Sequence, residues 1–225
     1  MANILDTSST PKTLTDTVYR QMRRDIISGK LAPETKLRIE HIRKEYEVGA
    51  TPLREALSRL SADGFVETEG QRGFRVTALS IADLDDITEL RITLELKALR
   101  QSVEAGDELW ESGVVSSYYQ LTKLESGGVY DVPEWEQRNH DFHWALLAAC
   151  TSPWLLRFYG IVYDQHKRYR NLSLSTSLQA RDVHAEHEQI YQAALARDLD
   201  LVCAASEQHI RLTADISRQR LADSL

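Results

Sequence analysis

The fold of this chain is decided by the stretch TPLREALSRLSADGFV, which runs from Thr51 to Val66. Its apolar residues recur at helical spacing and predict a helix with one buried face: Leu53, Ala56, Leu57 and Leu60. Thr51 can cap this helix through its hydroxyl, and Pro52 has the fixed φ that suits the first helical position. Arg54 lies outside the apolar stripe, and Gly64 ends the helix. The stretch therefore predicts a short helix with an exposed arginine in its first turn.

The residues on either side of this helix complete the pattern of a winged helix-turn-helix. Upstream, residues 13–28 and roughly 38–47 have the apolar spacing of two more helices. Downstream, two short strand-like runs, 65–68 and 74–77, flank a turn with two glycines and Arg72. A helix with arginine in its first turn suits the major groove of DNA, where arginine can bind guanine. We expect three helices and a two-stranded wing over residues 13–78, after a disordered tail over residues 1–12.

Residues 79–225 have the pattern of a second, all-α domain. The predicted helices cover about 80–104, the residues from Asp107 to Glu125, and about 133–149, 153–172, 178–197 and 199–220. Short links join them, and the serine-rich stretch 173–177 is predicted to separate the fourth from the fifth. Six helices with short links favour an antiparallel bundle. The fold class is therefore mainly α, with a winged helix-turn-helix followed by a six-helix bundle.

Charge and composition limit the classes of protein that the chain can represent. The net charge of the 225 residues is −7, but residues 1–78 carry 13 Lys and Arg against 11 Asp and Glu, whereas residues 79–225 carry 14 against 23. The net positive charge thus lies in the segment with the DNA-binding pattern, and the net negative charge in the rest of the chain. No run approaches the ~18 apolar residues of a membrane helix, and residues 1–11 lack the features of a signal peptide. We expect a cytoplasmic protein with no membrane partner, in which Cys150 and Cys203 are free, buried residues.

Three histidines of the second domain lie on apolar helix faces. Asn139 and His143 are four residues apart and project from one face, and His187 and His209 lie among apolar residues of two later helices. Three imidazoles and an amide oxygen could converge on a borderline divalent cation, with an open position for a ligand. The alternative from the residues alone is that each histidine bonds separately to a backbone carbonyl at the edge of the core. The other four histidines, and the basic run 167–170, are predicted to lie on the surface.

These patterns resemble those of a known family. The stretch from Thr51 to Val66 resembles the hallmark of GntR-type bacterial transcription factors, and the helical domain resembles the FCD ligand-binding domain of the FadR subfamily, in its shorter VanR-like branch. The second resemblance rests on Arg91 with Glu95, the run Phe142–Leu146, Glu186-His187 with Ile190, and Asp198 and His209. Together the two resemblances cover about residues 13–220.

The resemblance implies a role for each candidate residue. It assigns Asn139, His143, His187 and His209 to a divalent metal, zinc in the first place with nickel or manganese as alternatives. It assigns Arg91 to a small carboxylate effector, with no catalysis. For DNA it assigns Arg54 as the main contact, supported by Thr51, Arg72, Arg43 and Ala50.

Three positions depart from the common family pattern. Asn139 stands where members often have Asp, Gly49-Ala50 where serine and arginine are common, and Glu40 where a base-contacting arginine can occur. The first change replaces a charged metal ligand by a neutral one. The other two leave Arg54 with most of the expected contact to bases.

The resulting hypothesis is a homodimeric, ligand-responsive transcriptional repressor that binds a palindromic operator in double-stranded DNA. The alternative from another class is a metal-dependent hydrolase or isomerase in a helical bundle, with an accessory winged helix; three histidines with an open position would permit a metal-bound water. A third alternative is an architectural DNA-binding protein whose helical domain only dimerises. The hypothesis of a regulator predicts that the chain is not an enzyme.

Overall fold

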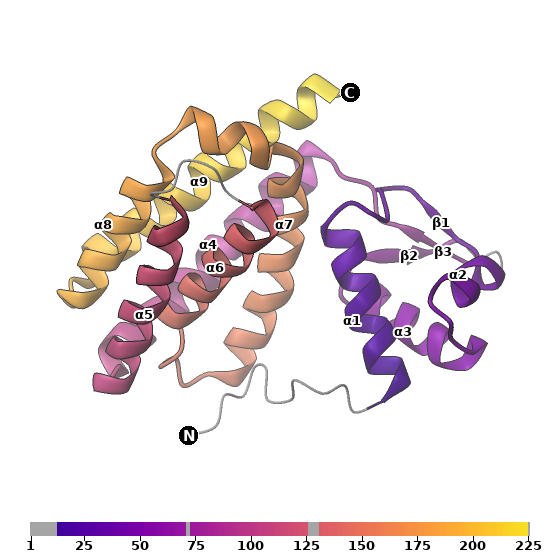
Figure 1. The fold of residues 1–225 in the computed structure, drawn as a ribbon, viewed down its shortest axis with the longest axis horizontal. Helices are drawn as coiled ribbons and strands as arrows, with labels where there is room; N and C mark the ends of the chain where they lie inside the picture. Colours follow the sequence, from indigo (N-terminus) through magenta and orange to yellow (C-terminus); the bar gives the residue numbers. More distant parts are fainter. Residues whose placement is uncertain (1–12, 71–72, 126–130, 225) are drawn as a thin grey trace. The chain divides into compact units, whose positions relative to one another are not determined.

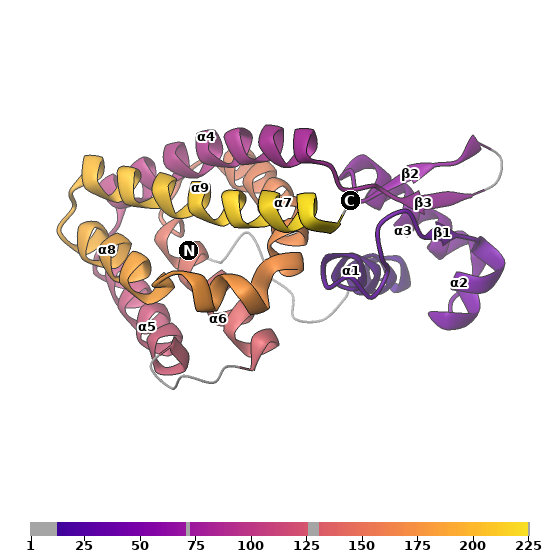
Figure 2. The same ribbon diagram turned by 90° about the horizontal axis from the view of Figure 1, so that it is seen from above.

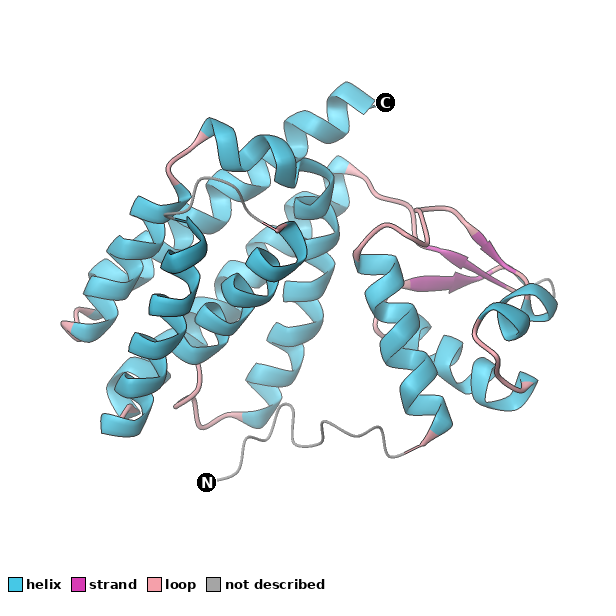
Figure 3. Cartoon of the chain, viewed as in Figure 1, coloured by secondary structure: helices cyan, strands magenta, loops and turns pink. Residues whose placement is uncertain are grey.

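The computed structural model describes residues 13–70, 73–125 and 131–224. The predicted disordered tail, residues 1–12, lies outside the described residues. The described residues form two compact units. One contains the residues up to Ile87 together with Ile161–Leu172, and the other contains Thr88–Gly160 and the residues from Ser173 onward. Helices account for most of both units, and strands occur only in the first among the described residues (Figure 3).

The first unit contains the three predicted helices of the winged helix-turn-helix. They are α1 (Leu14–Ile27), α2 (Ile39–Glu45) and α3 (Ala50–Ala62) (Figure 1). The hydroxyl of Thr13 caps α1 by accepting a hydrogen bond from the backbone N–H of Asp16 at 3.1 Å. Gly64 follows α3 with φ of 77°, a left-handed conformation that glycine adopts without strain. The predicted end of α3 at this glycine is confirmed.

The predicted start of α3 was wrong by two residues. The helix begins at Ala50, its N-cap residue is Gly49, and no side chain makes a capping hydrogen bond there. Thr51 and Pro52 are therefore the second and third helical residues rather than the cap and the first. Proline is tolerated at this place because the first N–H groups of a helix have no partner within the helix.

The sheet of the first unit has three strands, one more than the predicted two-stranded wing. The strands are β1 (Lys36–Leu37), β2 (Val66–Thr68) and β3 (Phe74–Val76). They are antiparallel in the order β1-β3-β2, and Arg75 of β3 lies opposite Glu67 on one side and Lys36 on the other. A strand of two residues is too short to show the alternation by which strands are predicted. This is why β1 was missed.

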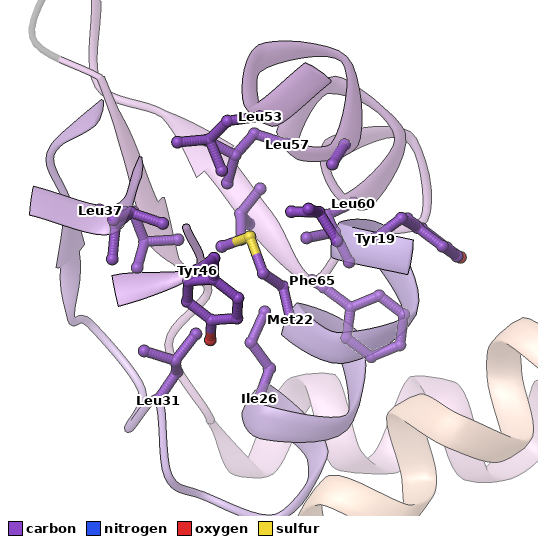
Figure 4. Packing of buried hydrophobic residues seen from close by; sticks show 14 of the residues in the cluster. Tyr19, Met22, Ile26, Leu31, Leu37, Tyr46, Leu53, Leu57, Leu60 and Phe65 are labelled. Carbon is purple, nitrogen blue, oxygen red and sulfur yellow. The ribbon is translucent and has the colours of Figure 1, made fainter. Parts of the chain in front are cut away.

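The core of the first unit collects the apolar faces of the three helices around the sheet (Figure 4). Met22 of α1, Leu53, Leu57 and Leu60 of α3, and Phe65 ahead of β2 are all fully buried. Burial of side chains of this size contributes roughly 1.5–3 kcal/mol each to folding. The apolar face from which this helix was predicted is therefore the face by which α3 packs into the domain. The opposite face of α3 remains exposed.

Residues 161–172, which belong to α7 (Pro153–Ala180), have their contacts in the first unit. Gln165 donates a hydrogen bond to the backbone oxygen of Asp63 at 2.7 Å, and Arg168 donates to both the hydroxyl and the backbone oxygen of Thr77 at 2.8 Å. Arg168 and His166 are buried. The prediction that the basic run 167–170 and His166 are solvent-exposed was therefore wrong; the Arg168 guanidinium is satisfied within the same unit by Thr77 and by Oε1 of Gln165.

The remaining helices build the all-α part of the chain, as predicted (Figures 1 and 2). They are α4 (Ile81–Ala105), α5 (Glu108–Glu125), α6 (Val132–Leu146), α8 (Val183–Leu195) and α9 (Leu199–Ser224), together with α7. The predicted break at the serine-rich stretch was wrong, because α7 continues to Ala180. The stretch contains no glycine or proline, and α8 starts only after Asp182, which caps it by accepting from the N–H of Ala185 at 2.9 Å.

Within the second unit, α5 packs against α6 and α8, and α8 packs against α9. Both ribbon views place α4 beside α9 (Figures 1 and 2), where Arg211 of α9 pairs with Glu89 of α4. Cys150 and Cys203 are free and buried, as expected. None of the described helices combines the length and apolar character that a membrane crossing requires.

Candidate functional site

The second unit brings the three predicted histidines together from three helices. His143 comes from α6, His187 from α8 and His209 from α9, and one ring nitrogen of each lies within 4.8 Å of those of the other two. The ring centroids are 5.7 Å apart for His143 and His187, 5.1 Å for His143 and His209, and 4.9 Å for His187 and His209. All three side chains are buried. The histidines therefore form one cluster rather than three separate features of the core edge.

Asn139 lies one helical turn before His143 on the buried face of α6 and is 1% exposed. Neither Oδ1 nor Nδ2 of its amide has a hydrogen-bond partner among the described residues. Burial of an amide without partners costs about 1–3 kcal/mol by mutational data, so such groups are rare in folded proteins. An amide oxygen without a hydrogen-bond partner, one helical turn from an imidazole, fits the requirements of a metal ligand.

The electrostatics of the cluster favour the neutral imidazole, which is the form that binds metals. Burial lowers the pKa of His143 to about 4, although the nearby Glu95 carboxylate acts in the opposite direction. Burial also lowers the pKa of His209 well below its usual range, and the neighbouring His187 and His143 add to this effect. Both side chains are therefore neutral at pH 7 and offer a lone pair without prior loss of a proton.

Carboxylates lie on the Nδ1 side of two of these histidines. Oε1 of Glu125, the last residue of α5, is 2.9 Å from Nδ1 of His187, and Oε2 of Glu186 is 2.8 Å from Nδ1 of His209. Glu125 was not among the predicted site residues, because nothing in its spacing connects it with a histidine 62 residues later. Glu186 was named only as part of the resemblance to the FCD domain.

Arg91 and Glu95 form a buried ion pair on α4, next to the histidines. Nε of Arg91 donates to Oε2 of Glu95 at 3.0 Å, and the two side chains are 1% and 4% exposed. Oε1 of Glu95 is 3.6 Å from Nδ1 of His143, which is longer than a hydrogen bond. Burial alone would raise the pKa of Glu95, but the neighbouring Arg91 guanidinium outweighs this effect, and the pKa is lowered to about 2. The Glu95 carboxylate thus lies between Arg91 and the histidine cluster.

Three of the five predicted DNA contacts come from the start of α3. Ala50 is the first residue of α3, and Thr51 and Arg54 are exposed in its first two turns. Arg59 lies further along the same helix, but it pairs with Asp16 at 3.2 Å and lies 4.1 Å from the centre of the Tyr19 ring. Arg54 is thus the arginine that α3 presents to solvent near its start.

The other two predicted DNA contacts have different outcomes. Arg43 is exposed in the last turn of α2 and lies 3.8 Å from Glu40. Arg72 lies outside the described residues.

Comparison with known proteins identifies both parts of the chain. Residues 14–76 match the model of the bacterial regulatory proteins of the gntR family, and residues 86–212 match that of the FCD domain. The uncharacterised HTH-type transcriptional regulator BphR of Paraburkholderia xenovorans is 42% identical, over 92% of this chain and 86% of that protein. The HTH-type transcriptional repressor GlaR of Escherichia coli is 33% identical, over 91% of this chain and 96% of that protein.

Solved structures agree with this fold assignment. Escherichia coli McbR/YncC superposes with a TM-score of 0.78 at 18% identity, over 93% of this chain and 99% of its own. A putative GntR regulator from Rhodococcus sp. RHA1 gives a TM-score of 0.72 at 20% identity, over 92% and 97%. The relatives named above are transcriptional regulators, so the alternative of a metal-dependent enzyme has no support. The chain belongs to the GntR family of bacterial transcriptional regulators and combines the DNA-binding domain of that family with an FCD domain.

Proposed function

We propose that this regulator is a repressor whose affinity for its operator is controlled by a small carboxylate, bound at a metal-containing site in the FCD domain. The observation that carries the proposal is the cluster of His143, His187 and His209, with the unpartnered amide of Asn139 one turn from His143. Burial of these polar side chains costs free energy that a set of apolar residues at the same positions would not cost.

The donor set fits a borderline divalent cation. His143, His187, His209 and Asn139 would hold it through three nitrogens and one oxygen, a combination that suits zinc first, with nickel or manganese as alternatives. When bound, the cation supplies a positive centre for an anionic ligand. The protein's own contribution is to keep its four ligands buried and to include no carboxylate among them, so that no ligand offsets the charge of the cation.

The proposed cation favours an anionic effector. None of its four proposed ligands is a carboxylate, and the buried guanidinium of Arg91 lies close to the cluster, paired with Glu95, which is 3.6 Å from His143. A small carboxylate would compensate positive charge that the protein ligands leave uncompensated, and an arginine is the side chain best suited to bind it. We therefore infer that Arg91 contributes to effector binding and that the effector is a small carboxylic acid.

On the DNA side, we propose that a homodimer presents two copies of α3 to the two halves of a palindromic operator. Arg54 would make the main contact to bases, with Thr51, Arg43, Ala50 and Arg72 in support. The name of GlaR as a repressor supports repression as the mode of action. An effector that binds one arrangement of the protein better than another changes its operator affinity, and by linkage the operator changes effector affinity by the same factor.

The test combines metal analysis with a ligand screen. Elemental analysis of the purified protein is expected to find about one equivalent of divalent metal per chain. A thermal-shift screen of small carboxylates on zinc-loaded protein is expected to yield stabilising compounds that release operator DNA in a gel-shift assay at fixed salt. His143→Ala and His187→Ala should lose metal and the response to these compounds but keep operator binding. Absence of metal from the wild-type protein, together with no uptake of zinc, would disprove the metal centre.

A further inference from the structure

The histidine cluster is surrounded by carboxylates that are not themselves members of the proposed ligand set. Glu125 ends α5, 62 residues before His187, and its side chain is 2% exposed. It lies there because it accepts several hydrogen bonds: Trp135 Nε1 is 3.2 Å from Oε1, and His184 Nδ1 is 3.1 Å from Oε2. A glutamate carboxylate that already receives N–H groups on both oxygens is a hydrogen-bond acceptor in this place.

The contact of Glu125 with His187 determines which nitrogen of that imidazole carries the proton. Oε1 of Glu125 is 2.9 Å from Nδ1 of His187, within hydrogen-bond distance. Because an ionised carboxylate has no proton to donate, Nδ1 must be the protonated nitrogen. Nε2 then carries the lone pair, and it is buried without a hydrogen-bond partner among the described residues. A buried acceptor of this kind is the atom that a metal would use.

Glu186 stands in the same relation to His209. Its Oε2 is 2.8 Å from Nδ1 of His209. Nη2 of Arg181 is 3.1 Å from the same nitrogen, but arginine has only donors, so Glu186 is the group that can accept a proton from Nδ1. Arg181 also pairs with Glu186 and so offsets the charge of this half-buried carboxylate.

We propose that Glu125 and Glu186 are positioning residues, which hold His187 and His209 in the Nδ1–H tautomer and so turn both Nε2 atoms toward one divalent cation. The proposal rests on the metal centre proposed above and adds to it two residues that touch no metal. Partners of this kind fix the orientation of a ligating imidazole and raise its basicity, and their loss typically costs about 10–100-fold in metal affinity. The same role is not assigned to Glu95 toward His143, because its Oε1 is 3.6 Å from Nδ1 of His143 and its other oxygen is bound to Arg91.

The tautomers can be measured without any metal. Two-bond nitrogen–proton correlation spectra of the zinc-free protein, at pH 7.5, are expected to show His187 and His209 protonated at Nδ1. In Glu125→Ala, the His187 signals should move to a mixture of the two tautomers while those of His209 stay unchanged; Glu186→Ala should do the reverse. A zinc-free wild type with His187 protonated at Nε2 would overturn the assignment.

Zinc affinity, measured by competition with a chromophoric chelator, gives the second readout. We expect Glu125→Ala and Glu186→Ala to raise the Kd for zinc by about 10–100-fold. The Kd of Glu125→Gln for zinc should lie between those of the alanine variants and the wild type. This variant should also keep the Nδ1–H tautomer of His187, because an amide oxygen still accepts from Nδ1. It also carries the test if Glu125→Ala does not fold, since it preserves the shape of the side chain. Wild-type zinc affinity in both alanine variants would contradict the proposal.

Two variants serve as controls. Glu188→Ala removes a carboxylate from α8, the helix of His187, where it is bonded to Tyr118 and Gln192, and should leave tautomers and zinc affinity unchanged. His184→Ala removes the exposed partner of Glu125 and leaves the hydrogen bond between Glu125 and His187 in place.

The proposed metal centre and the proposed role of the carboxylates fail in different ways. A wild type that shows the expected tautomers but takes up no zinc disproves the metal centre. A wild type that binds zinc with the opposite tautomer disproves only the role of the carboxylates.

Discussion

Asn139 and His143 lie one helical turn apart on the buried face of α6, and the amide of Asn139 has no hydrogen-bond partner among the described residues. A protein selected for stability alone would place an apolar residue at this position, because the unpaired amide costs free energy. The position therefore has the character of a site where stability is given up for binding. Replacements at Asn139 can separate these two properties.

We expect Asn139→Leu to raise the stability of the zinc-free protein by about 1 kcal/mol, because an apolar side chain of similar size replaces a buried, unsatisfied amide. The same change should weaken zinc binding, since a ligand is lost. Asn139→Asp should have the opposite effect on zinc and tighten it about tenfold or more, because the ligand becomes charged. Urea unfolding of EDTA-treated protein and chelator competition measure the two quantities. Lower stability together with unchanged zinc affinity in Asn139→Leu would show that the amide is structural.

Arg54→Ala is expected to lower specific operator affinity by about 10–100-fold, the loss of one good contact to a base. The fold should be unaffected, because Arg54 is exposed whereas the opposite face of α3 is buried. Gel shifts at fixed salt, with specific and unrelated DNA, check this, and thermal unfolding checks the fold. Lys97→Ala, which removes one exposed positive charge from α4 of the FCD domain, is the matched control. Equal losses on both DNAs would mean that Arg54 binds only phosphate.

The effects of replacing Arg91 and Glu95 on the free energy of unfolding should be coupled. Arg91→Met leaves the buried Glu95 carboxylate without its main partner, so we expect a loss of about 3–5 kcal/mol. Glu95→Leu alone should also destabilise, because it leaves the guanidinium buried. The double variant Arg91→Met/Glu95→Leu should be more stable than the sum of the single losses predicts. Denaturant unfolding of the four proteins gives the coupling energy, and strict additivity would mean that the two groups are compensated by other partners.

The sequence could predict the helical framework because it is encoded locally. The apolar spacing in α1 and α3 and the breaks at Gly64 and Gly106 depend only on residues within a few turns of each other. Where such local signals are weak, the prediction failed. The two residues of β1 gain their conformation from pairing with β3, and the serines of α7 favour neither helix nor break strongly enough to decide.

The candidate site shows the same division. The positions of His143, His187 and His209 on apolar faces could be recognised one helix at a time, but their convergence depends on how α6, α8 and α9 pack. Glu125 could not be found at all, because its role comes from a contact between the end of α5 and α8. A single sequence indicates which residues are unusual for their place in a helix, and only the tertiary structure shows which of them meet.

The stability of the zinc-free protein should fall as the pH decreases from about 6.5 toward 4. His143 has an ordinary pKa of 6.5 in the unfolded chain, whereas burial lowers its pKa in the folded protein to about 4. Between these values the unfolded chain binds more protons, so the stabilisation is complete above pH 6.5 and is lost as the pH falls. His209, whose pKa is also lowered by burial, contributes with the same sign.

Urea midpoints of EDTA-treated protein at pH 7.5, 6.5 and 5.5 should show this loss of stability, and His143→Gln should make it smaller. His41→Gln, in the exposed part of α2, should keep the wild-type slope, and a wild type as stable at pH 5.5 as at 7.5 would contradict the neutral, buried state of the cluster.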